Sequence, residues 1–194
     1  ENQHKLMTVK VESEVLRETQ LVVCLLFQYA GMSFVDFAHL KERNIKNGIL
    51  DYNRQKTGTP MRLEILDTAE LMRKELMGDK KPASGYLFPF LSGTKTGYEA
   101  YLEYNAALSR FNRNLKALKK AAGIASDVTS YTIRHSFAMA LKEQNVPIEM
   151  ISELLGHKSI KTTQIYLRSF SLEKMTVVNK SCFENVYNYM PEVG

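Results

Sequence analysis

A long apolar run near the start of the chain stands out in its pattern of hydrophobic and polar positions. Apolar residues become frequent from Ser13 to Tyr29, and the continuous run Leu21 to Phe27 stops shortly before Gly31. An apolar run that ends close to a glycine is typical of a buried helix with a glycine at its C-terminus. The pattern therefore predicts a central core helix over residues 13–29.

After this run the pattern changes from helical spacing to that of strands. Two segments with strand character, 49–54 and 61–66, flank a short turn that contains Lys56 and Gly58. Two such segments joined by a glycine-containing turn predict an antiparallel hairpin. We expect Lys56 to lie at the tip of this hairpin.

Helical signals dominate the rest of the chain, as capping residues or as apolar positions at helical spacing. The predicted helices cover 33–40, 67–78, 98–122, 129–141 and 147–156, and a last one begins at Ser159. Residues 1–12 are polar and unpatterned, which predicts a linker or a frayed end. The predicted fold class is mainly α with one small antiparallel β-sheet or hairpin (α+β).

Composition places the chain among globular proteins with a basic surface. Its 194 residues are 44% hydrophobic and 24% charged, which suits one sizeable domain. The net charge of +5 favours an anionic partner, and both nucleic acid and an acidic membrane qualify. The run Leu21 to Phe27 is far shorter than the ~20 residues that a membrane span needs. We expect a cytoplasmic protein that does not enter a membrane.

The other compositional signals are weak. Cys24 and Cys182 are far apart in the chain, which favours free thiols over a disulfide framework, and no metal-binding spacing is visible. In the helix over 98–122 the residues Arg110, Arg113 and Lys116 occupy faces other than the apolar one. This basic side indicates either DNA contact or a solvated surface.

The segment from Tyr131 to Leu167 carries the chemistry. It contains Arg134 within Ile-Arg-His, His157 within Leu-Gly-His-Lys-Ser, and Tyr166 shortly after two threonines. In order and spacing these residues resemble the core motifs of the tyrosine recombinase family. The resemblance implies the catalytic-domain fold of that family and an enzyme that cuts and rejoins DNA through a 3′-phosphotyrosyl intermediate.

The resemblance also implies a role for each residue. Tyr166 matches the nucleophile, and Arg134 matches the second arginine, whose planar fork suits a phosphate. His157 matches the position that hydrogen-bonds the phosphate or assists proton movement. Lys56 matches the hairpin lysine that protonates the departing 5′ oxygen. Because the covalent ester stores the bond energy, neither a nucleotide cofactor nor a metal is implied.

Two positions depart from the family pattern. Tyr131 stands where the family usually has histidine, and we carry it over as a supporting residue that can hydrogen-bond. Ser33 stands where most members have their first arginine, while Asp36 matches the acidic partner of that arginine. The stretch Gly-Met-Ser-Phe-Val-Asp resembles integrases of Bacteroides-type mobile elements, which often carry arginine at the place of Ala30. A serine at position 33 is already explained by a capping box, in which Ser33 is the N-cap of the predicted helix 33–40.

Because Ser33 stands in place of the first arginine, the sequence is compatible with more than one activity. Arg54 lies two residues before Lys56, which predicts the same strand face, and it is a candidate for the missing positive charge. The first reading is an active recombinase, and the alternative is a catalytically weakened DNA-binding or regulatory derivative. A third, more distant reading is a topoisomerase or resolvase that acts as a single protomer.

The predicted organisation follows from the same resemblance. Residues 1–12 are the linker, 13–180 the catalytic domain, and 181–194 a tail helix that docks on a neighbouring protomer or back on its own domain. We expect double-stranded DNA as the partner, with Ser33 and Arg54 as candidate phosphate ligands and Lys158 as a candidate DNA contact. The family implies a homotetramer on DNA, or a monomer in isolation, and an upstream core-binding domain that this chain does not contain.

Overall fold

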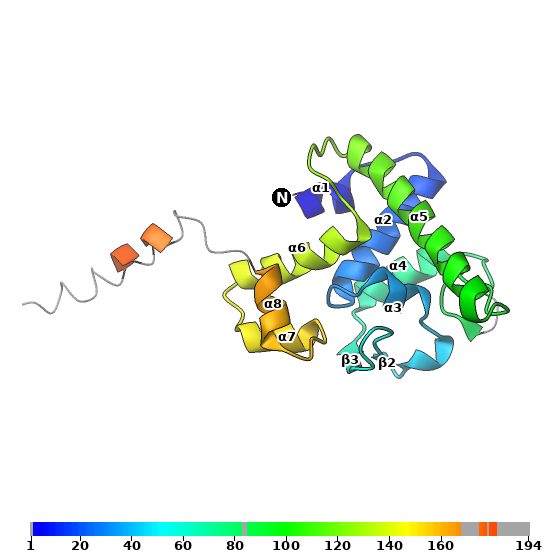
Figure 1. The fold of residues 1–194 in the computed structure, drawn as a ribbon. Coiled ribbons are helices and arrows are strands. Elements are labelled where there is room, and N and C mark those ends of the chain that lie inside the picture. The colour runs from blue at the N-terminus through cyan, green and yellow to red at the C-terminus, as the bar shows by residue number, and fades with distance from the viewer. Residues whose placement is uncertain (1, 83–84, 168–174, 178, 182–194) are drawn as a thin grey trace, which may run out of the picture.

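The helix α2 (Glu14–Gln28) passes through the centre of the molecule and organises the fold (Figure 1). Its N-cap is Ser13, whose hydroxyl accepts a hydrogen bond from the backbone N–H of Leu16 at 3.5 Å. Val23, Leu25 and Leu26 are completely buried, and each such side chain contributes about 1.5–3 kcal/mol through burial. The predicted central core helix is therefore confirmed.

This computed structural model describes residues 2–82, 85–167, 175–177 and 179–181. The other helices are α1 (Asn2–Thr8), α3 (Phe34–Ala38), the 3-10 turn η1 (Glu42–Asn44), α4 (Asp67–Met77), α5 (Gly97–Ala121), α6 (Ser130–Glu143), α7 (Ile148–Leu154) and α8 (Ile160–Tyr166). Helices α1, α4, α5 and α6 pack against α2. Every helix expected between residues 13 and 167 is present, within a few residues of its predicted ends, whereas the expected tail helix 181–194 lies almost wholly outside the described residues.

A three-stranded antiparallel sheet in the order β1-β2-β3 lies at one edge of the molecule, below α3 in Figure 1. The strands are β1 (Ile45–Lys46), β2 (Ile49–Asn53) and β3 (Pro60–Glu64). In the predicted hairpin of β2 and β3, Leu50 pairs with Leu63. The short β1 was not expected, since two residues are too few to show an alternating pattern. The predicted fold class, mainly helical with a small antiparallel sheet, is confirmed.

The first twelve residues correct one expectation. They do not form a frayed end, because residues 2–8 form α1, and Leu6 is buried at 3% exposure in the main core. The amide nitrogen of Gln20 on α2 donates to the carbonyl oxygens of Leu6 and Val9 at 3.0 and 2.8 Å. A single buried leucine gives no visible period, so tertiary contacts with α2 decide the structure here.

Two apolar clusters meet where the chain enters α6. The larger cluster fills the space around α2 and includes residues of α1, α4, α5 and the sheet. The smaller one contains Ala138 of α6, Ile151 of α7 and Leu155, which is the C-cap of α7. Figure 1 shows α7 and α8 lying together beside α6, away from α4 and α5. Helix α6, which carries Arg134, therefore contributes to both clusters, with Ile133 in the larger one and Ala138 in the smaller one.

A tight turn after α2 shapes this junction. Ala30 and Gly31 both have positive φ values, 55° and 64°. A Cβ atom on Gly31 would lie 2.8 Å from Cδ1 of Phe137 on α6, closer than real Cβ atoms come. Glycine is therefore required at position 31, and α2 and α6 approach each other closely at this point.

Tyr29 gives a prediction for stability. Its side chain is 1% exposed, and its hydroxyl has no hydrogen-bond partner among the described residues. Burial raises the pKa of this phenol to about 12. Because an unsatisfied buried hydroxyl costs about 1–3 kcal/mol, we expect Tyr29→Phe to raise the free energy of unfolding by about 1 kcal/mol, measured by urea denaturation. Tyr98→Phe, at a position that is 73% exposed, is the control and should change nothing.

Among the described residues, no helix has the length and apolar character needed to cross a membrane.

Candidate active site

Arg134 is the central side chain of the site. It lies in the second turn of α6, whose N-cap Thr129 accepts a hydrogen bond from the backbone N–H of Thr132. The side chain is only 4% exposed. Its Nη1 donates to the carbonyl oxygen of Gly31 at 2.8 Å, and its Nη2 donates to the carbonyl oxygen of Leu155. Arg134 thus joins the turn after α2 to the end of α7.

Arg54 forms a second buried guanidinium next to α3. It is 8% exposed, and its Nε lies 3.4 Å from Oδ2 of Asp36, which is 2% exposed. Its Nη1 donates to the carbonyl oxygen of Gly156 at 3.0 Å. Two arginines therefore use the consecutive carbonyls of Leu155 and Gly156, just beyond the C-terminal end of α7, where backbone acceptors lack helical partners.

Asp36 is held by more than this ion pair. Its Oδ1 accepts from the backbone N–H of Gln55 at 2.7 Å, and the Ser33 hydroxyl donates to its Oδ2 at 2.5 Å. Ser33 is also the N-cap of α3, as the capping box predicted. The Asp36 carboxylate therefore links three groups: the Ser33 hydroxyl at the start of α3, the backbone of Gln55 and the Arg54 guanidinium.

Gly156, which follows α7, allows Arg54 to pack closely against the backbone. Gly156 has a φ of +62°. A Cβ atom on it would lie 2.4 Å from Sδ of Met61 and 2.7 Å from Cδ of Arg54. Any side chain at position 156 would therefore force Met61 and Arg54 to shift, and it would also strain the backbone at this positive φ.

His157 lies next to Arg134 and is half-buried. Its Nδ1 is 2.9 Å from the hydroxyl of Thr163 on α8, and its Nε2 is 3.4 Å from Nη2 of Arg134. Burial, and then the charges of Arg134 and Arg54, lower the pKa of the imidazole to about 4. The ring is therefore neutral at pH 7.

This pKa predicts an acid-sensitive fold. An unfolded histidine titrates near pH 6.5, so between about pH 6.5 and about pH 4 the unfolded chain binds a proton that the folded His157 does not. The His157 contribution is fully present above about pH 6.5 and is lost as the pH falls toward 4. We expect the free energy of unfolding, measured by urea titration at several pH values, to decline less steeply over this range in His157→Gln. Equal slopes would contradict the lowered pKa.

The remaining predicted catalytic residues lie in the β2–β3 turn, at the start of α6 and at the end of α8. Lys56 is exposed in the turn between β2 and β3, where the hairpin pattern placed it. Tyr131 is 60% exposed in the first turn of α6, three residues before Arg134. Tyr166 is the last residue of α8, and its side chain lies outside what the structure describes. Tyr166 therefore lies on the same helix as Thr163, the residue that contacts His157.

One expectation about Arg54 is wrong. The strand β2 ends at Asn53, so the alternation of faces does not extend from Arg54 to Lys56. Arg54 is buried, whereas Lys56 is exposed. The turn geometry sends Arg54 into the site and leaves Lys56 at the surface.

The predicted DNA contacts on α5 lie on its exposed side. Arg110, Arg113 and Lys116 are exposed, while Phe111 and Leu115 are buried, as the amphipathic pattern predicted. Lys158 is exposed immediately after His157. Exposure suits both DNA contact and a solvated surface, so these four residues remain candidates.

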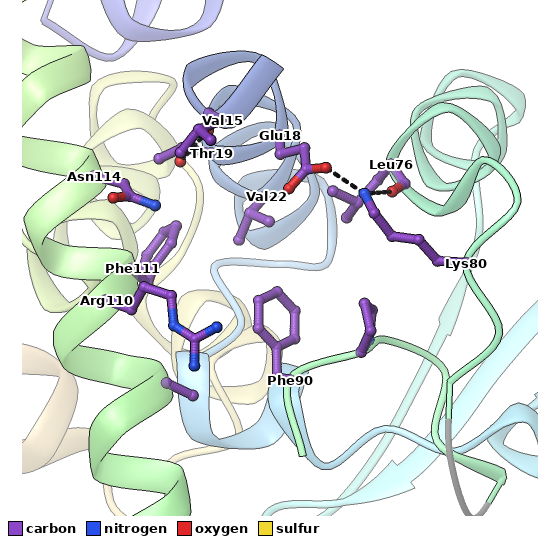
Figure 2. Close-up of a pocket in the computed structure, with 12 residues that line it drawn as sticks. Val15, Glu18, Thr19, Val22, Leu76, Lys80, Phe90, Arg110, Phe111 and Asn114 are labelled. Carbon is purple, nitrogen blue, oxygen red and sulfur yellow. Dashed lines mark hydrogen bonds and ion pairs between the residues drawn. The ribbon is translucent and has the colours of Figure 1, made fainter. Parts of the chain in front are cut away.

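Arg110 also borders a cavity of about 340 Å³ between α2, α4 and α5. Figure 2 shows Arg110 at one end of this cavity and the ion pair of Glu18 and Lys80 at the other. Phe90 and Phe111 form part of its apolar wall. The residues that line this cavity include none of the predicted catalytic residues, so it is separate from the arginine cluster.

Within the described residues, no group of three or more His, Cys, Asp or Glu side chains is placed to hold a metal ion. The cluster instead combines two guanidiniums, one carboxylate and a neutral imidazole. This arrangement carries a net positive charge and offers N–H donors, which suits an anion with several oxygens, such as a phosphodiester.

Comparison with known proteins agrees with this geometry. The profile of the phage integrase family matches residues 1–173. The chain belongs to this family. The matched range spans the hairpin and α6 to α8, and the match confirms the resemblance to tyrosine recombinases.

Individual family members match over shorter segments. The tyrosine recombinase XerD of Lacticaseibacillus casei is 44% identical over 69 residues, which are 36% of this chain and 24% of that protein. The matched region thus spans about a quarter of that relative's length.

Solved structures match nearly the whole chain. The crystal structure of XerA recombinase has a TM-score of 0.67 at 20% identity, over 92% of this chain and 61% of that one. The integrase of the transposon Tn1549, solved in complex with a circular intermediate DNA, also has a TM-score of 0.67, at 14% identity, over 92% of this chain and 63% of that one. These likenesses confirm the fold class.

Some residues of the site were not visible as such in the sequence. Thr163 appeared only as part of a family motif, although it is completely buried and contacts His157. The carbonyls of Gly31, Leu155 and Gly156 belong to the site as well, and backbone acceptors leave no trace in a side-chain pattern. The nearest available signal was the pair of glycines, since each follows a predicted helix.

Proposed function

We propose that this chain is the catalytic domain of a tyrosine recombinase, which cuts and rejoins double-stranded DNA through a covalent 3′-phosphotyrosyl intermediate. The observation that carries this proposal is the cluster formed by the buried Arg134 and Arg54 with the neutral, half-buried His157. Membership of the phage integrase family supports it.

The chemistry of the cluster fits phosphoryl transfer. Attack on a phosphodiester builds negative charge on the non-bridging oxygens, and guanidinium groups in a water-poor site stabilise that charge best. Both guanidiniums are already oriented by backbone carbonyls, so little reorganisation is needed when DNA binds. The two positive charges of Arg134 and Arg54 exceed the single negative charge of Asp36, so one positive charge remains to bind the phosphate.

Arg54 is proposed to replace the first arginine of the family. Ser33 has a short side chain that is occupied with Asp36, and it provides no positive charge. Arg54, which follows β2, pairs with the same carboxylate oxygen. The cation is thus supplied from a different place in the chain, which supports an active enzyme over the catalytically weakened derivative.

The other roles follow from the family. Tyr166 is proposed as the nucleophile, and Lys56, exposed on its hairpin, as the acid that protonates the leaving 5′ oxygen. Tyr131, exposed near the start of α6, is proposed as a supporting hydrogen-bond donor. No nucleotide cofactor is needed, because the ester with Tyr166 conserves the energy of the broken bond.

The partners and wider organisation are also proposals. DNA is the proposed substrate, with Arg110, Arg113, Lys116 and Lys158 as backbone contacts, and the Tn1549 integrase provides a precedent in complex with DNA. A tetramer on DNA, an upstream core-binding domain and an origin in a mobile element follow from the resemblance. Of the proposed tail helix 181–194, residues 182–194 lie outside the described residues, so the choice between docking in cis and in trans is left to experiment.

The function is tested by trapping the covalent intermediate. The protein is incubated with a randomised duplex library that carries a nick, so that the cleaved fragment diffuses away and religation fails. Adducts that survive SDS are recovered, and their DNA is sequenced to identify the target. A protein–DNA adduct joined through a 3′ phosphate supports the recombinase. DNA binding with no adduct on any duplex supports the regulatory derivative.

A further inference from the structure

The cavity between α2, α4 and α5 has the size and the walls of a small-molecule site (Figure 2). Its volume of about 340 Å³ falls within the range of ~300–1,000 Å³ that is typical of ligand pockets. Core side chains form much of its surface, since Val22, Leu76, Ala107 and Phe111 are each at most 5% exposed. The cavity therefore reaches the apolar core.

A core aromatic residue holds the aromatic part of the wall in place. Phe111 stacks on Phe34, with ring centroids 4.7 Å apart and an interplanar angle of 9°. Phe90 packs edge-to-face on the same Phe34 ring, with centroids 5.3 Å apart. Because Phe34 is 3% exposed and touches both rings, a rotation of either ring toward the cavity would break a core contact. The wall is thus formed before any ligand binds, which lowers the cost of binding.

The charged groups at the two ends of the cavity differ in their partners. Glu18 and Lys80 pair with each other at one end, and Nζ of Lys80 also donates to the carbonyl oxygen of Leu76 at 3.2 Å. At the other end, Arg110 has no ion pair or hydrogen bond with any residue that the structure describes. Figure 2 shows its guanidinium reaching from α5 toward Phe90. One uncompensated positive charge therefore borders the cavity.

Asn114 adds a neutral polar group beside Arg110. The two residues are four positions apart on α5, so they lie on the same face of the helix, and both line the cavity. A guanidinium fork binds both oxygens of a carboxylate, and an amide nitrogen can donate a further hydrogen bond. The single charge suits a monoanion, and the apolar walls suit a body without polar groups.

We propose that this cavity binds a small aromatic monocarboxylate. The carboxylate pairs with Arg110 and Asn114, and the ring packs against Phe90 and Phe111. Edge-to-face and offset contacts between rings favour an aromatic body over an aliphatic chain. This site goes beyond the proposed function and shares only Arg110 with the proposed DNA contacts, so its test needs no DNA and is independent of cleavage.

Cinnamate tests the site, with cinnamamide as its uncharged counterpart. The full chain is labelled with ¹³C in its methyl groups, and the signals of Val22 and Leu76 are followed by NMR during each titration at pH 7. We expect cinnamate to shift them with a Kd of about 1 mM or lower, given its size. Cinnamamide should bind about tenfold more weakly, because it lacks the charge-assisted hydrogen bond. No shift up to the solubility limit, or equal affinities, would overturn the proposal.

A variant tests whether Arg110 holds the carboxylate. Arg110→Met removes the charge and keeps an unbranched apolar stem, so it should weaken cinnamate about tenfold and leave cinnamamide unchanged. Arg113→Met is the matched control, since Arg113 is exposed on the same helix and is not among the residues that line the cavity. Wild-type affinity for cinnamate in Arg110→Met would refute the assignment.

A further variant and a second probe test the place and the occupant. Ala107→Leu fills part of the cavity and should weaken both compounds, and unchanged binding by this folded variant contradicts the proposal. If it does not fold, the comparison of Arg110→Met with Arg113→Met decides. The second probe is a synthetic peptide with the sequence of residues 182–194, added to the full chain. If it shifts the same methyl signals at lower concentration than cinnamate, the cavity takes a peptide segment, and the small-ligand proposal fails.

Discussion

Tyr166→Phe is expected to abolish the covalent protein–DNA adduct while leaving the fold and the DNA affinity unchanged. The substitution removes one oxygen atom and almost no volume, so packing around α8 should persist. Without the phenol oxygen no ester to phosphorus can form. Loss of a catalytic nucleophile costs up to about 10⁶-fold in rate in other enzymes, which places the residual adduct below detection on SDS gels.

The control for this experiment is another tyrosine. Tyr101 on α5 is 58% exposed and lies outside the arginine cluster, so Tyr101→Phe should form the adduct at the wild-type rate. Gel-shift titration of both variants on the selected duplex reports DNA affinity. An adduct that persists in Tyr166→Phe would show that a different residue attacks the phosphate, and the nucleophile assignment would then be abandoned.

Arg54→Ala is expected to have the second-largest effect, because it damages both stability and cleavage. Removing one partner of a buried ion pair leaves Asp36 unpaired in the interior, which costs about 3–5 kcal/mol in the free energy of unfolding. Removing one transition-state donor lowers a rate by about 10²–10³. Urea denaturation and the rate of adduct formation measure the two effects on the same protein.

A second variant separates the two effects of Arg54. In the double variant Arg54→Ala with Asp36→Asn, the unpaired charge is gone, so part of the stability should return while cleavage stays slow. Adding Ser33→Arg to Arg54→Ala should partly restore cleavage, because it returns a guanidinium to the place where most family members carry it. Arg62→Ala, at an exposed position on β3, is the control and should leave both measurements unchanged. Normal cleavage by Arg54→Ala would refute the compensation.

Local signals in the sequence were sufficient for most of the fold. Helix α2 was predicted from one apolar run, and α3 and α6 from their capping residues Ser33 and Thr129, because these interactions involve positions within four residues of each other. Helix α1 was missed because Leu6 is its single buried residue, and its position depends on Gln20. Strand β1 was missed because two residues are too short for any period.

The sequence by itself determined the family, the helical architecture, and the candidates Arg134, His157, Tyr166 and Lys56, since order and spacing of these residues along the chain suffice for that. Only the tertiary structure decided how they are held. Arg134 bonds a carbonyl 103 positions away, and Arg54 bonds one 102 positions away. Such partners are brought together by packing of the two apolar clusters, and backbone carbonyls are the same at every residue. No periodicity could therefore have revealed that Arg54 is buried against Asp36, or that Thr163 faces His157.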